Sequence, residues 1–414
     1  MISVQEAQNR ILAQVTAMPA LRVGLREALG RFAAEPVAAL QDSPAFANSA
    51  MDGYALRAAQ TLGASPGSPL RMAVAATAAA GTPLKKPLLP GEAARIYTGA
   101  VLPEGLDAVV KQEDVVAERG YLELSRPVKE GENVRARGEE FRAGEEILAR
   151  GACLTPATLA LLAGQGIHEV SVFRPPRVGI LVTGTEIVAP GMPLEPGQIY
   201  DSNSFALAAA LRELYLEPVS VSRCRDQREE LAWRIATDLE GCDFLLVTGG
   251  VSVGDFDFVR ETAANLGIRE SFWKVRQKPG KPIFFGRQGE KKYFFGLPGN
   301  PASALVCFYE YVRPALLRAL GAAEGRLPRL SLPLAAAFRK KPGLAHFLRA
   351  RAELAGTGGQ VRILEQQGSH TLQSFGQANA LVLVPEEVEV LPAGAPVEVH
   401  LLPALLGEGG GPRP

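Results

Sequence analysis

The 414-residue sequence contains few cysteines, no long apolar run and no excess of charge of either sign. Its four cysteines are scattered and form no CxxC pair, which argues against a structural zinc site and against a disulfide framework. No run approaches the roughly 18 apolar residues of a membrane-spanning helix. The first residues, MISVQEAQNRIL, also lack the apolar region of a signal peptide. We therefore expect a cytoplasmic protein with no membrane partner.

The balance of charge excludes a second group of functions. Lysine plus arginine and aspartate plus glutamate number 44 each, so no overall field favours nucleic acid or an anionic membrane surface. Any anion site must therefore be local. The chain is also longer than the about 250–300 residues at which a single core stops growing, so several domains are expected.

The most informative stretch runs from residue 243 to residue 301. It begins with DFLLVTGG, an apolar run whose length and composition suit a strand buried on both faces. Gly249 and Gly250 end the run, and glycines after a buried strand let the backbone turn sharply and approach a ligand. Two carboxylates, Asp255 and Asp257, follow in the same loop.

Acidic residues also follow two other predicted strands. From residue 177 onward, strands alternate with helices over short connections, which predicts a mostly parallel sheet with helices on both faces. Glu186 and Asp226 each stand at the carboxyl end of a predicted strand, as Asp257 does. Because the carboxyl ends of parallel strands share one edge of a sheet, we expect these acids to converge on one site.

Basic residues gather in the segment WKVRQKPGKP, which contains Lys274, Lys278 and Lys281. A further predicted strand, YFFGLPGNP, ends in a turn-rich loop and leads into a helix that begins near Ala302. Lysines suit a polyanion and carboxylates suit a hard metal ion, so the mixed charge indicates a site for both.

Three motifs together, TGGVSVGDFD, WKVRQKPGKP and GLPGNP, closely resemble the molybdopterin molybdenumtransferase family, of the bacterial MoeA type and including the gephyrin E domain. The segments PAFANSAMDGYA and QGSHTLQSF resemble the same family, in family order along nearly the whole chain. The resemblance implies an enzyme of molybdenum cofactor biosynthesis that inserts molybdenum from molybdate into adenylated molybdopterin and releases AMP. It also implies a Mg²⁺ cofactor, a homodimer with shared active sites and a partnership with the upstream molybdopterin adenylyltransferase.

The resemblance assigns roles to individual residues. The implied catalytic residues are Asp52, Thr98, Glu186, Asp226, Asp257, Lys274 and Lys278. The implied substrate-binding residues are Asn48, Ser49, Arg137, Gly249, Gly250, Ser252, Lys281, Pro298, Gly299, Asn300, Ser369 and Ser374. The implied metal ligands are Glu186, Asp226 and Asp257.

The chemistry of the substrate agrees with these roles. Lysines supply positive charge for the phosphates of adenylated molybdopterin and for molybdate. Backbone N–H groups at residues 249–250 and 299–300 can cradle phosphates without net charge. Carboxylates repel a polyanion unless a cation lies between them, so the acids are expected to bind Mg²⁺. No residue has the surroundings of an activated covalent nucleophile.

Several of these residues have ordinary explanations when they are taken alone. Asp52, which precedes a glycine, is more often part of a plain turn, and the charged turn around Arg137 is usually solvated surface. The family form of that second turn ends in Gly-Glu-Asp where this chain has Glu140, so the role of Glu140 stays open. A lone histidine such as His370, without a partner acid or cysteine, makes no catalytic triad.

The expected architecture is multidomain α/β plus β. It consists of a central, mostly parallel three-layer α/β sheet domain, a small β domain, an extended N-terminal linker domain and a C-terminal β-barrel-like domain. In that description the boundaries are 175–322 for the α/β domain, 41–149 for the small β domain, 1–40 with 150–174 for the linker domain, 323–405 for the C-terminal domain and 406–414 for a disordered tail. Helices are predicted from Ser3 to about Ala17, with Ser3 and Glu6 as a capping box, and from Leu25 to Phe32.

Two other interpretations remain. Related α/β domains occur in nicotinamide-nucleotide amidases of the competence-damage type and in the upstream adenylyltransferase, although NSAMDGYA and the added β domains count against both. A non-enzymatic scaffold is the other class, since the gephyrin E domain also anchors receptors. Asp52, Asp257 and the three lysines favour an enzyme, because a scaffold has no use for them.

Overall fold

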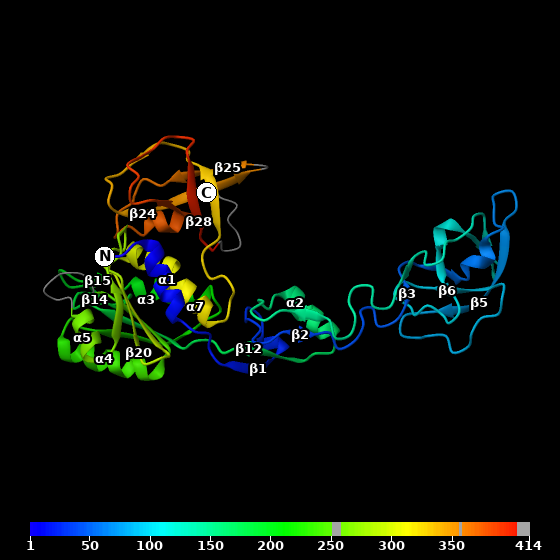
Figure 1. Cartoon of the computed structure of the whole chain (residues 1–414), viewed down its shortest axis with the longest axis horizontal. Helices are drawn as coiled ribbons and strands as arrows, with labels where there is room; N and C mark the ends of the chain where they lie inside the picture. Colours follow the sequence, from blue (N-terminus) through cyan, green and yellow to red (C-terminus); the bar gives the residue numbers. More distant parts are fainter. Residues whose placement is uncertain (251–257, 356–357, 404–414) are drawn as a thin grey trace. The chain divides into compact units, whose positions relative to one another are not determined.

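The computed structural model describes residues 1–250, 258–355 and 358–403, and the chain divides into two compact units (Figure 1). The large unit comprises Met1–Ala34, Gly151–Thr155 and Glu169–Pro414, and the small unit comprises Glu35–Arg150 and Pro156–His168. Each unit has hydrophobic cores of its own. None of the helices in the described part of the chain is long and apolar enough to cross a membrane.

The first helix of the large unit, α1 (Val4–Gln14), begins where the sequence predicts it and ends a few residues earlier. The Ser3 hydroxyl accepts a hydrogen bond from the Glu6 N–H at 3.1 Å, which satisfies one of the N–H groups at the start of the helix. The Glu6 carboxylate does not complete the predicted capping box, because it accepts a hydrogen bond from Arg10 at 2.6 Å instead.

The predicted helix from Leu25 to Phe32 is wrong. In this region the structure has β1 (Ala20–Gly24), a 3₁₀ turn (Leu25–Glu27) and, paired antiparallel with β1, the strand β12 (Glu169–Phe173). Gly30 has a left-handed backbone conformation, with φ at +73°, and it packs so closely on Tyr215 that an added Cβ would lie 2.4 Å from the ring. A helix cannot continue through that conformation, so the chain turns there.

The large unit is built on a six-stranded sheet. From edge to edge its strands are β16 (Pro218–Cys224), β13 (Val178–Thr183), β17 (Phe244–Thr248), β21 (Lys292–Leu297), β20 (Phe284–Gln288) and β18 (Arg269–Trp273). Only β20 pairs antiparallel with both of its neighbours, so the sheet is mostly parallel. Strands β13 and β17 are buried throughout, which explains their continuous apolar sequences. A short parallel pair, β14 (Ile187–Val188) and β15 (Ile199–Tyr200), lies between β13 and the next helix.

Helices cover both faces of this sheet. One face packs against α1, α3 (Asn203–Arg212) and a helix that runs from α6 (Pro301–Cys307) through a π turn (Phe308–Val312) to α7 (Arg313–Ala319). The other face packs against α4 (Arg228–Gly241) and α5 (Val259–Asn265). Phe244 and Leu246 of β17 belong to the first core, whereas Leu245 and Val247 belong to the second. The arrangement therefore has three layers.

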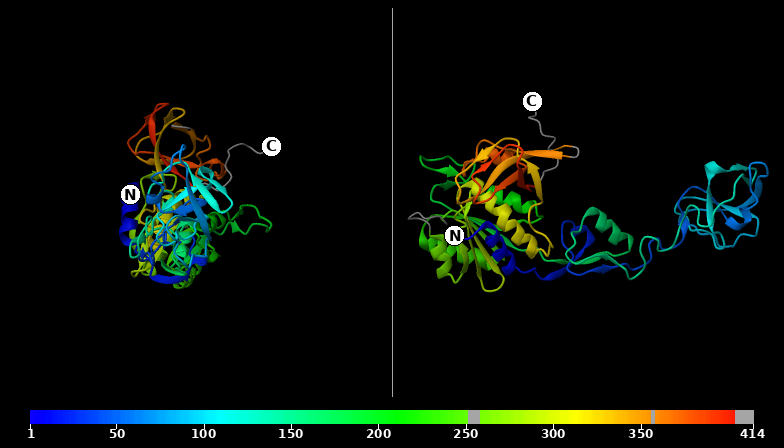
Figure 2. Two further views of the ribbon diagram at one scale, coloured as in Figure 1. Left: turned by 90° about the vertical axis from the view of Figure 1, so that its right-hand side faces the viewer. Right: turned by 45° about the horizontal axis from the view of Figure 1, so that its top comes forward.

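The C-terminal part of the large unit forms a second sheet, orange to red in Figures 1 and 2. Its strand path is β19 (Gln277–Lys278), β24 (Ala345–Ala355), β26 (Ala380–Val384), β28 (Pro396–Leu401) and β22 (Arg329–Pro333), and β25 (Gly358–Ile363) pairs with β24. Beside it lie the pair β23 (Phe338–Arg339) and β27 (Val390–Leu391) and the helix α8 (Gln373–Gln377). Strand β19 belongs to the lysine-rich segment between β18 and β20, so this segment joins the second sheet.

The small unit contains a third six-stranded sheet. Its strands, in spatial order, are β7 (Ala108–Lys111), β4 (Gly53–Leu56), β6 (Glu92–Ile96), β5 (Leu70–Ala78), β9 (Tyr121–Leu124) and β8 (Val116–Glu118). The rest of the unit consists of the pairs β2 (Val37–Ala38) with β11 (Glu146–Leu148) and β3 (Asn48–Ser49) with β10 (Val134–Arg135), the helix α2 (Pro156–Gly164) and two 3₁₀ turns (Ala58–Thr61 and Gln112–Asp114). Neighbouring residues of β4 enter different cores, Leu56 on one face of the sheet and Ala55 on the other.

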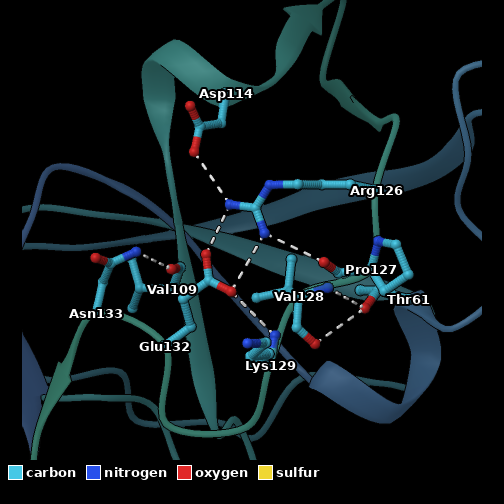
Figure 3. A network of polar contacts seen from close by, with 9 residues as sticks. All are labelled: Thr61, Val109, Asp114, Arg126, Pro127, Val128, Lys129, Glu132 and Asn133. Atoms are coloured by element: carbon cyan, nitrogen blue, oxygen red, sulfur yellow. Dashed lines mark hydrogen bonds and ion pairs between the residues drawn. The ribbon is translucent and has the colours of Figure 1, made fainter.

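Arg126 organises one loop of the small unit (Figure 3). Its guanidinium donates to both carboxylate oxygens of Glu132, at 2.7 and 3.2 Å, and to Asp114 at 3.1 Å. The hydrogen bond from Arg126 lowers the pKa of Glu132, against the effect of burial. The Thr61 hydroxyl accepts a hydrogen bond from the Val128 N–H at 2.8 Å. These contacts fix the loop to the sheet, and none of them involves a residue predicted for the site.

Candidate functional site

A cleft of about 570 Å³ lies at the carboxyl edge of the central sheet. Its walls come from the loops that follow β13, β16, β17 and β21 and from the start of α3. The polar, charged and turn-forming residues that line it include Thr183, Glu186, Asp201, Asn203, Asp226, Thr248, Gly249, Gly250, Pro298, Gly299, Asn300 and His370. The structure thus brings together two of the predicted acids and both glycine-containing loops.

Asp226 is held in this cleft by uncharged groups. The Thr183 hydroxyl donates to one carboxylate oxygen, and the Thr185 N–H donates to the other at 3.3 Å. Glu186 is exposed beside them. Neither Asp226 nor Glu186 forms an ion pair with any described Lys or Arg. Both carboxylates therefore keep their negative charge free for a cation.

The third acid of the cleft, Asp201, has a different role. Its carboxylate accepts hydrogen bonds from the Ser204 N–H at 3.0 Å and from the Ser204 hydroxyl at 2.6 Å. The first of these bonds satisfies an N–H group at the amino end of α3. We therefore assign Asp201 to the fold.

The predicted metal set is only partly described. Asp257 and Ser252 lie outside the described residues. Within residues 1–250, 258–355 and 358–403, no three or more His, Cys, Asp and Glu side chains lie close enough together to hold a metal ion. The described members of the set are thus Glu186 and Asp226.

The turn after β17 depends on glycine. Gly249 has φ at +99°, and a Cβ at this position would lie 2.3 Å from the Thr183 carbonyl oxygen. Its N–H donates to the Leu297 carbonyl oxygen at 3.1 Å. That N–H ties β17 to the end of β21, so it is already used within the protein and does not belong to the predicted phosphate cradle.

Two residues that sequence reasoning did not single out hold the GLPGNP loop in place. The Asn203 amide donates to the Thr248 hydroxyl at 2.7 Å and to the Gly299 carbonyl oxygen at 2.8 Å. The Thr248 hydroxyl donates in turn to the Pro298 carbonyl oxygen at 3.1 Å. The position of Thr248 directly before two glycines was the available signal. Asn203 gave no signal beyond its place at the start of a helix.

A second cleft, of about 1050 Å³, adjoins the first and shares Pro282, Pro298, Asn300 and His370 with it. Lys278 and Lys281 line it, as the sequence suggested for a phosphate site. The sequence run RKK at 339–341 lines it too, together with His346, and sequence reasoning overlooked both. The second cleft is thus lined by cations where the first carries acids.

Lys274 does not line either cleft. It has a positive φ of 68°, and its Nζ atom lies 3.7 Å from the centroid of the Trp273 ring.

The C-terminal loop QGSH meets the GLPGNP loop at the boundary between the two clefts. The Asn300 amide donates to the Ser369 hydroxyl at 3.1 Å, and the Ala302 N–H donates to the Ser369 carbonyl oxygen at 3.1 Å. Two predicted substrate-binding residues, 69 positions apart in the sequence, are therefore in direct contact.

A buried arginine supports the QGSH loop from behind. Arg349 of β24 is fully buried and donates to the Gln366 and Gly368 carbonyl oxygens, each at 2.9 Å. It also donates to the Ser374 hydroxyl at 3.2 Å, and burial lowers the pKa of the guanidinium. Ser374 is buried as well and lines neither cleft, so its observed role is to bind Arg349. Sequence reasoning missed Arg349, because nothing in a strand sequence shows that its partners are distant carbonyl groups.

In the small unit, the structure pairs Asp52 with Thr98. One carboxylate oxygen of Asp52 accepts hydrogen bonds from the Thr98 N–H at 2.8 Å and from the Thr98 hydroxyl at 2.7 Å. These bonds, with a smaller contribution from the charge of Arg95, lower the pKa of Asp52. Asp52 is exposed and ionised, so this predicted pair presents a carboxylate of fixed orientation at the surface of the unit.

Asn48 and Ser49 shape the turn that precedes Asp52. The Ser49 hydroxyl donates to the Met51 carbonyl oxygen at 2.5 Å and accepts from the Met51 N–H at 3.3 Å. The Asn48 amide donates to the Phe46 carbonyl oxygen at 3.3 Å. Both side chains therefore bind their own loop.

The charged turn around Arg137 folds back on the residues before Asn48. Arg137 donates to Asp42 at 2.5 Å, and Glu140 accepts a hydrogen bond from the Ser43 hydroxyl at 2.7 Å. The Arg137 side chain is 69% exposed, which leaves most of its surface available to a ligand.

A mostly parallel α/β sheet, with an acidic cleft at its carboxyl edge and a lysine-rich cleft beside it, is typical of proteins that bind phosphorylated ligands at strand ends. Comparison with known proteins narrows this class. Residues 2–166 match the MoeA N-terminal region (domain I and II), residues 179–318 match a probable molybdopterin binding domain, and residues 331–402 match the MoeA C-terminal region (domain IV).

Relatives match over the full length of the chain. The chain is 36% identical to the molybdopterin molybdenumtransferase of Haemophilus influenzae, over 98% of this chain and 100% of the relative. It is 38% identical to that of Synechococcus elongatus, over 97% of this chain and 100% of the relative. The crystal structure of the molybdopterin biosynthesis MoeA protein from Pyrococcus horikoshii superposes with a TM-score of 0.84 at 29% identity, covering 97% of this chain and 100% of that one. The chain belongs to the MoeA family of molybdopterin molybdenumtransferases.

Proposed function

We propose that the chain inserts molybdenum from molybdate into adenylated molybdopterin, with Mg²⁺-dependent release of AMP. The observation that carries this proposal is the pair of adjoining clefts, one acidic and one basic, on either side of the GLPGNP loop. A substrate with a pyrophosphate needs both kinds of cleft: cations for its phosphates and carboxylates for a metal ion that neutralises them. Membership of the family over the full length agrees with the proposal.

The phosphates belong in the lysine-rich cleft. Lys278 and Lys281 line it with further cations, and no Asp or Glu lines it within the described part of the chain. Charge-assisted hydrogen bonds from ammonium groups to phosphate oxygens are among the stronger polar contacts in proteins. The same charges would attract the molybdate oxyanion.

The metal belongs in the acidic cleft. Mg²⁺ is usually bound by one or two carboxylates together with substrate phosphates, so Glu186 and Asp226 fit this ion without a complete protein cage. We assign Asp257 to the same set from the sequence. When bound there, Mg²⁺ would reduce the negative charge of the pyrophosphate and stabilise AMP as the leaving group. The hydrogen bonds from the Thr183 hydroxyl and the Thr185 N–H hold the Asp226 carboxylate in a fixed orientation for binding the metal ion.

Five predicted residues lie in the small unit, and for them we propose a shared site: Asn48, Ser49, Asp52, Thr98 and Arg137. Asp52 and Thr98 belong to the small unit, whereas Glu186 and Asp226 belong to the large unit. We propose a homodimer with twofold symmetry in which each site uses Asp52 of one chain and Asp226 of the other. In this arrangement residues 1–40 and 150–174 form an extended linker domain, 41–149 the small β domain, 175–322 the α/β domain and 323–405 a β-barrel-like domain.

We also propose a cytoplasmic location and direct supply of the substrate by the upstream molybdopterin adenylyltransferase. Adenylated molybdopterin is reactive at its pyrophosphate and dithiolene groups. A short path between two enzymes would therefore protect it.

The function is tested by incubating the purified chain with molybdopterin-AMP, molybdate and Mg²⁺ and measuring the release of AMP. We expect release that requires both molybdate and Mg²⁺. Tight binding of nicotinamide mononucleotide without any binding of molybdopterin-AMP would favour the amidase interpretation and contradict the proposal.

The shared site is tested by mixing two inactive variants, Asp52→Ala and Asp226→Ala. With random exchange of subunits half of the dimers are mixed, and each mixed dimer has one intact site, so activity should recover to about a quarter of the wild-type value. Mixtures that exchange subunits and remain inactive would show that both residues act within one chain.

A further inference from the structure

The lysine-rich cleft concentrates positive charge in a chain whose formal net charge is zero. Besides His346, the basic residues that line it are Lys278, Lys281, Arg339, Lys340, Lys341 and His370. Lysine and arginine side chains are ordinarily cations at neutral pH, although burial lowers the pKa of Lys340. A histidine is the one kind of side chain here whose usual pKa lets its charge respond to what is bound.

His346 lies directly beside one of these cations. It is on β24, where its Cα pairs with that of Lys278 in the parallel neighbour β19 and with that of Val384 in β26 on the other side. Side chains of paired residues point to the same face of a sheet, and neighbouring strands lie about 4.8 Å apart. The imidazole of His346 and the ammonium group of Lys278 are therefore held side by side in the wall of the cleft.

Lys340 provides a second fixed cation near the same imidazole. Its Nζ atom donates to the Leu344 carbonyl oxygen at 2.9 Å and to the Glu386 carbonyl oxygen at 3.1 Å, and the residue is buried. The carboxylate of Glu386 is already bound by Arg276 at 2.6 Å, and Glu387 is exposed. The charges of Glu387 and Glu386 offset part of the charge of Lys340, but neither carboxylate forms an ion pair with Lys278, Lys340 or His346.

The surroundings of His346 disfavour its charged form. Burial, followed by the charges of Lys340 and Lys278, lowers the pKa of His346 to about 4. No hydrogen bond from either ring nitrogen to another described residue is present. The imidazole is thus uncharged at neutral pH and has polar atoms ready for a ligand.

We propose that His346 contacts a phosphorylated ligand in this cleft and takes up a proton as the ligand binds. The inference rests on the proposed function, in which adenylated molybdopterin brings its phosphates to the lysine-rich cleft. Phosphate oxygens between the lysines and the imidazole would replace repulsion by attraction, because an anion within 4–6 Å favours the protonated form of a histidine. In the ligand-free protein the same residue adds no further repulsion to the cluster of cations.

Proton uptake has a reciprocal consequence for affinity. If an anion favours protonation of His346, protonation must favour binding of the anion to the same extent. Affinity for a phosphate ligand should therefore increase as the pH falls, between the higher titration midpoint of the bound state and the lower midpoint of the free state. The expected gain is up to about tenfold per pH unit in that interval.

The inference is tested by nuclear magnetic resonance of the histidine side chains, of which the chain has four. Imidazole signals of the ¹³C-histidine-labelled protein are followed against pH without and with saturating inorganic pyrophosphate. His346→Gln identifies the signal of His346, and the three remaining histidines report whether that variant is folded. We expect the midpoint of His346 to rise by at least about one pH unit when pyrophosphate is bound.

Lys278→Gln provides a second, ligand-free test. Removal of the neighbouring charge should raise the midpoint of His346 toward its usual value without any anion. An unchanged midpoint in this variant would show that the two side chains are not juxtaposed and would overturn the inference.

The histidine titration and the AMP-release assay together distinguish a failure of this inference from a failure of the proposed function. If pyrophosphate shifts the signal of His370 while the midpoint of His346 stays near 4, the inference is wrong, and AMP release by the wild-type protein would leave the proposed function standing. If the midpoint of His346 rises but no AMP is released, the inference holds and the proposed function is wrong. If no histidine signal responds to pyrophosphate, the cleft does not bind phosphate and the inference is overturned.

Discussion

The two ends of the central sheet each hold an aspartate with little exposure, and they hold it in different ways. At the amino end, Asp243 precedes β17 and accepts two hydrogen bonds from Arg174, at 2.9 and 3.0 Å, and one from the Arg177 N–H at 2.7 Å. At the carboxyl end, Asp226 follows β16 and, among the described residues, accepts hydrogen bonds from the Thr183 hydroxyl and the Thr185 N–H, both of which are uncharged.

This difference separates a carboxylate that stabilises the fold from one that is available for function. The Asp243 carboxylate forms ion pairs with the side chains of Arg174 and Arg177, at 2.9 and 3.7 Å, so its charge is offset within the protein, and removing it leaves two cations without that counter-charge. A carboxylate held by a hydroxyl and an N–H is oriented but keeps its charge. At the amino end of the sheet, arginines therefore pair with the aspartate. At the carboxyl end, the acids remain available to bind a cation.

The largest effect is expected from Asp226→Asn. The substitution keeps the shape of the side chain but removes the charge, so the rate of AMP release should fall by at least about 100-fold. Because the partners of Asp226 are uncharged, the free energy of unfolding should change by less than about 0.5 kcal/mol. Both chain tryptophans lie in the large unit, so their fluorescence during denaturation reports this unit. Equal losses of stability and activity would contradict the functional assignment of Asp226.

The two ends of the sheet also differ in how strictly their turns require glycine. Gly249→Ala at the carboxyl edge places a Cβ 2.3 Å from the Thr183 carbonyl oxygen and should cost roughly 2–4 kcal/mol of unfolding free energy. Gly289 lies in the turn between β20 and β21, at the other end of the sheet, also has a positive φ and has no atom within 4 Å of its added Cβ. Gly289→Ala should therefore cost only about 1 kcal/mol. Similar costs in chemical denaturation would show that close packing of the turn after β17 is not what requires glycine.

Asp243→Asn should affect stability instead of catalysis. Burial raises the pKa of Asp243, but the hydrogen bonds and charges of Arg174 and Arg177 outweigh it and hold the pKa below the usual 3.8. The ionised form therefore contributes stability above pH 3.8, and this contribution is lost as the pH falls through the lower pKa of the folded state. The variant should lose about 2 kcal/mol at pH 7 and show a smaller acid-induced loss than the wild type.

Denaturation curves between pH 3 and pH 7 check this expectation. The activity per folded molecule of Asp243→Asn should equal that of the wild type. A variant that is fully stable but inactive would reverse the roles assigned to the two ends of the sheet.

The smallest expected effect is on the affinity for pyrophosphate, compared between a lysine of the lysine-rich cleft and a lysine at the amino end of the central sheet. Lys278→Gln should weaken binding of pyrophosphate about tenfold, because it removes one charge-assisted contact in the lysine-rich cleft. Lys292 at the start of β21 donates to the Leu239 carbonyl oxygen, and Lys292→Gln should leave the affinity unchanged. Calorimetric titration of both variants with pyrophosphate measures the difference. Equal weakening would point to the overall charge of the protein as the source of affinity.

The sequence predicted a residue's place in the fold best where a local pattern determines the position of a strand. Continuous apolar runs predict buried strands such as β13 and β17. Because the strands alternate with helices, their carboxyl ends lie at the same edge of the sheet. The convergence of Glu186, Asp226 and the GLPGNP loop followed from that topology. The predicted helix from Leu25 to Phe32 failed because Gly30 turns the chain with a positive φ and Phe32 pairs with the distant Cys153.

Other parts of the site could not be found in this way. Arg349, Asn203 and Thr248 act through hydrogen bonds to loops that are far away in the sequence, and their partners are backbone carbonyl groups that carry no sequence signal. His346 became notable only when β19 placed Lys278 beside it. These positions depend on which strands become neighbours, and that is a property of the folded chain.

Metal binding distinguishes acids at the carboxyl edge of the sheet, which we expect to bind a metal ion, from acids at the amino end, which we do not. Mn²⁺ shares the preference of Mg²⁺ for oxygen ligands, and its bound fraction can be counted by electron paramagnetic resonance in the presence of pyrophosphate. We expect Asp226→Asn and Glu186→Gln to weaken Mn²⁺ binding by at least about tenfold, and Asp243→Asn to bind Mn²⁺ as the wild type does. Equal Mn²⁺ affinity in all four proteins would contradict this distinction.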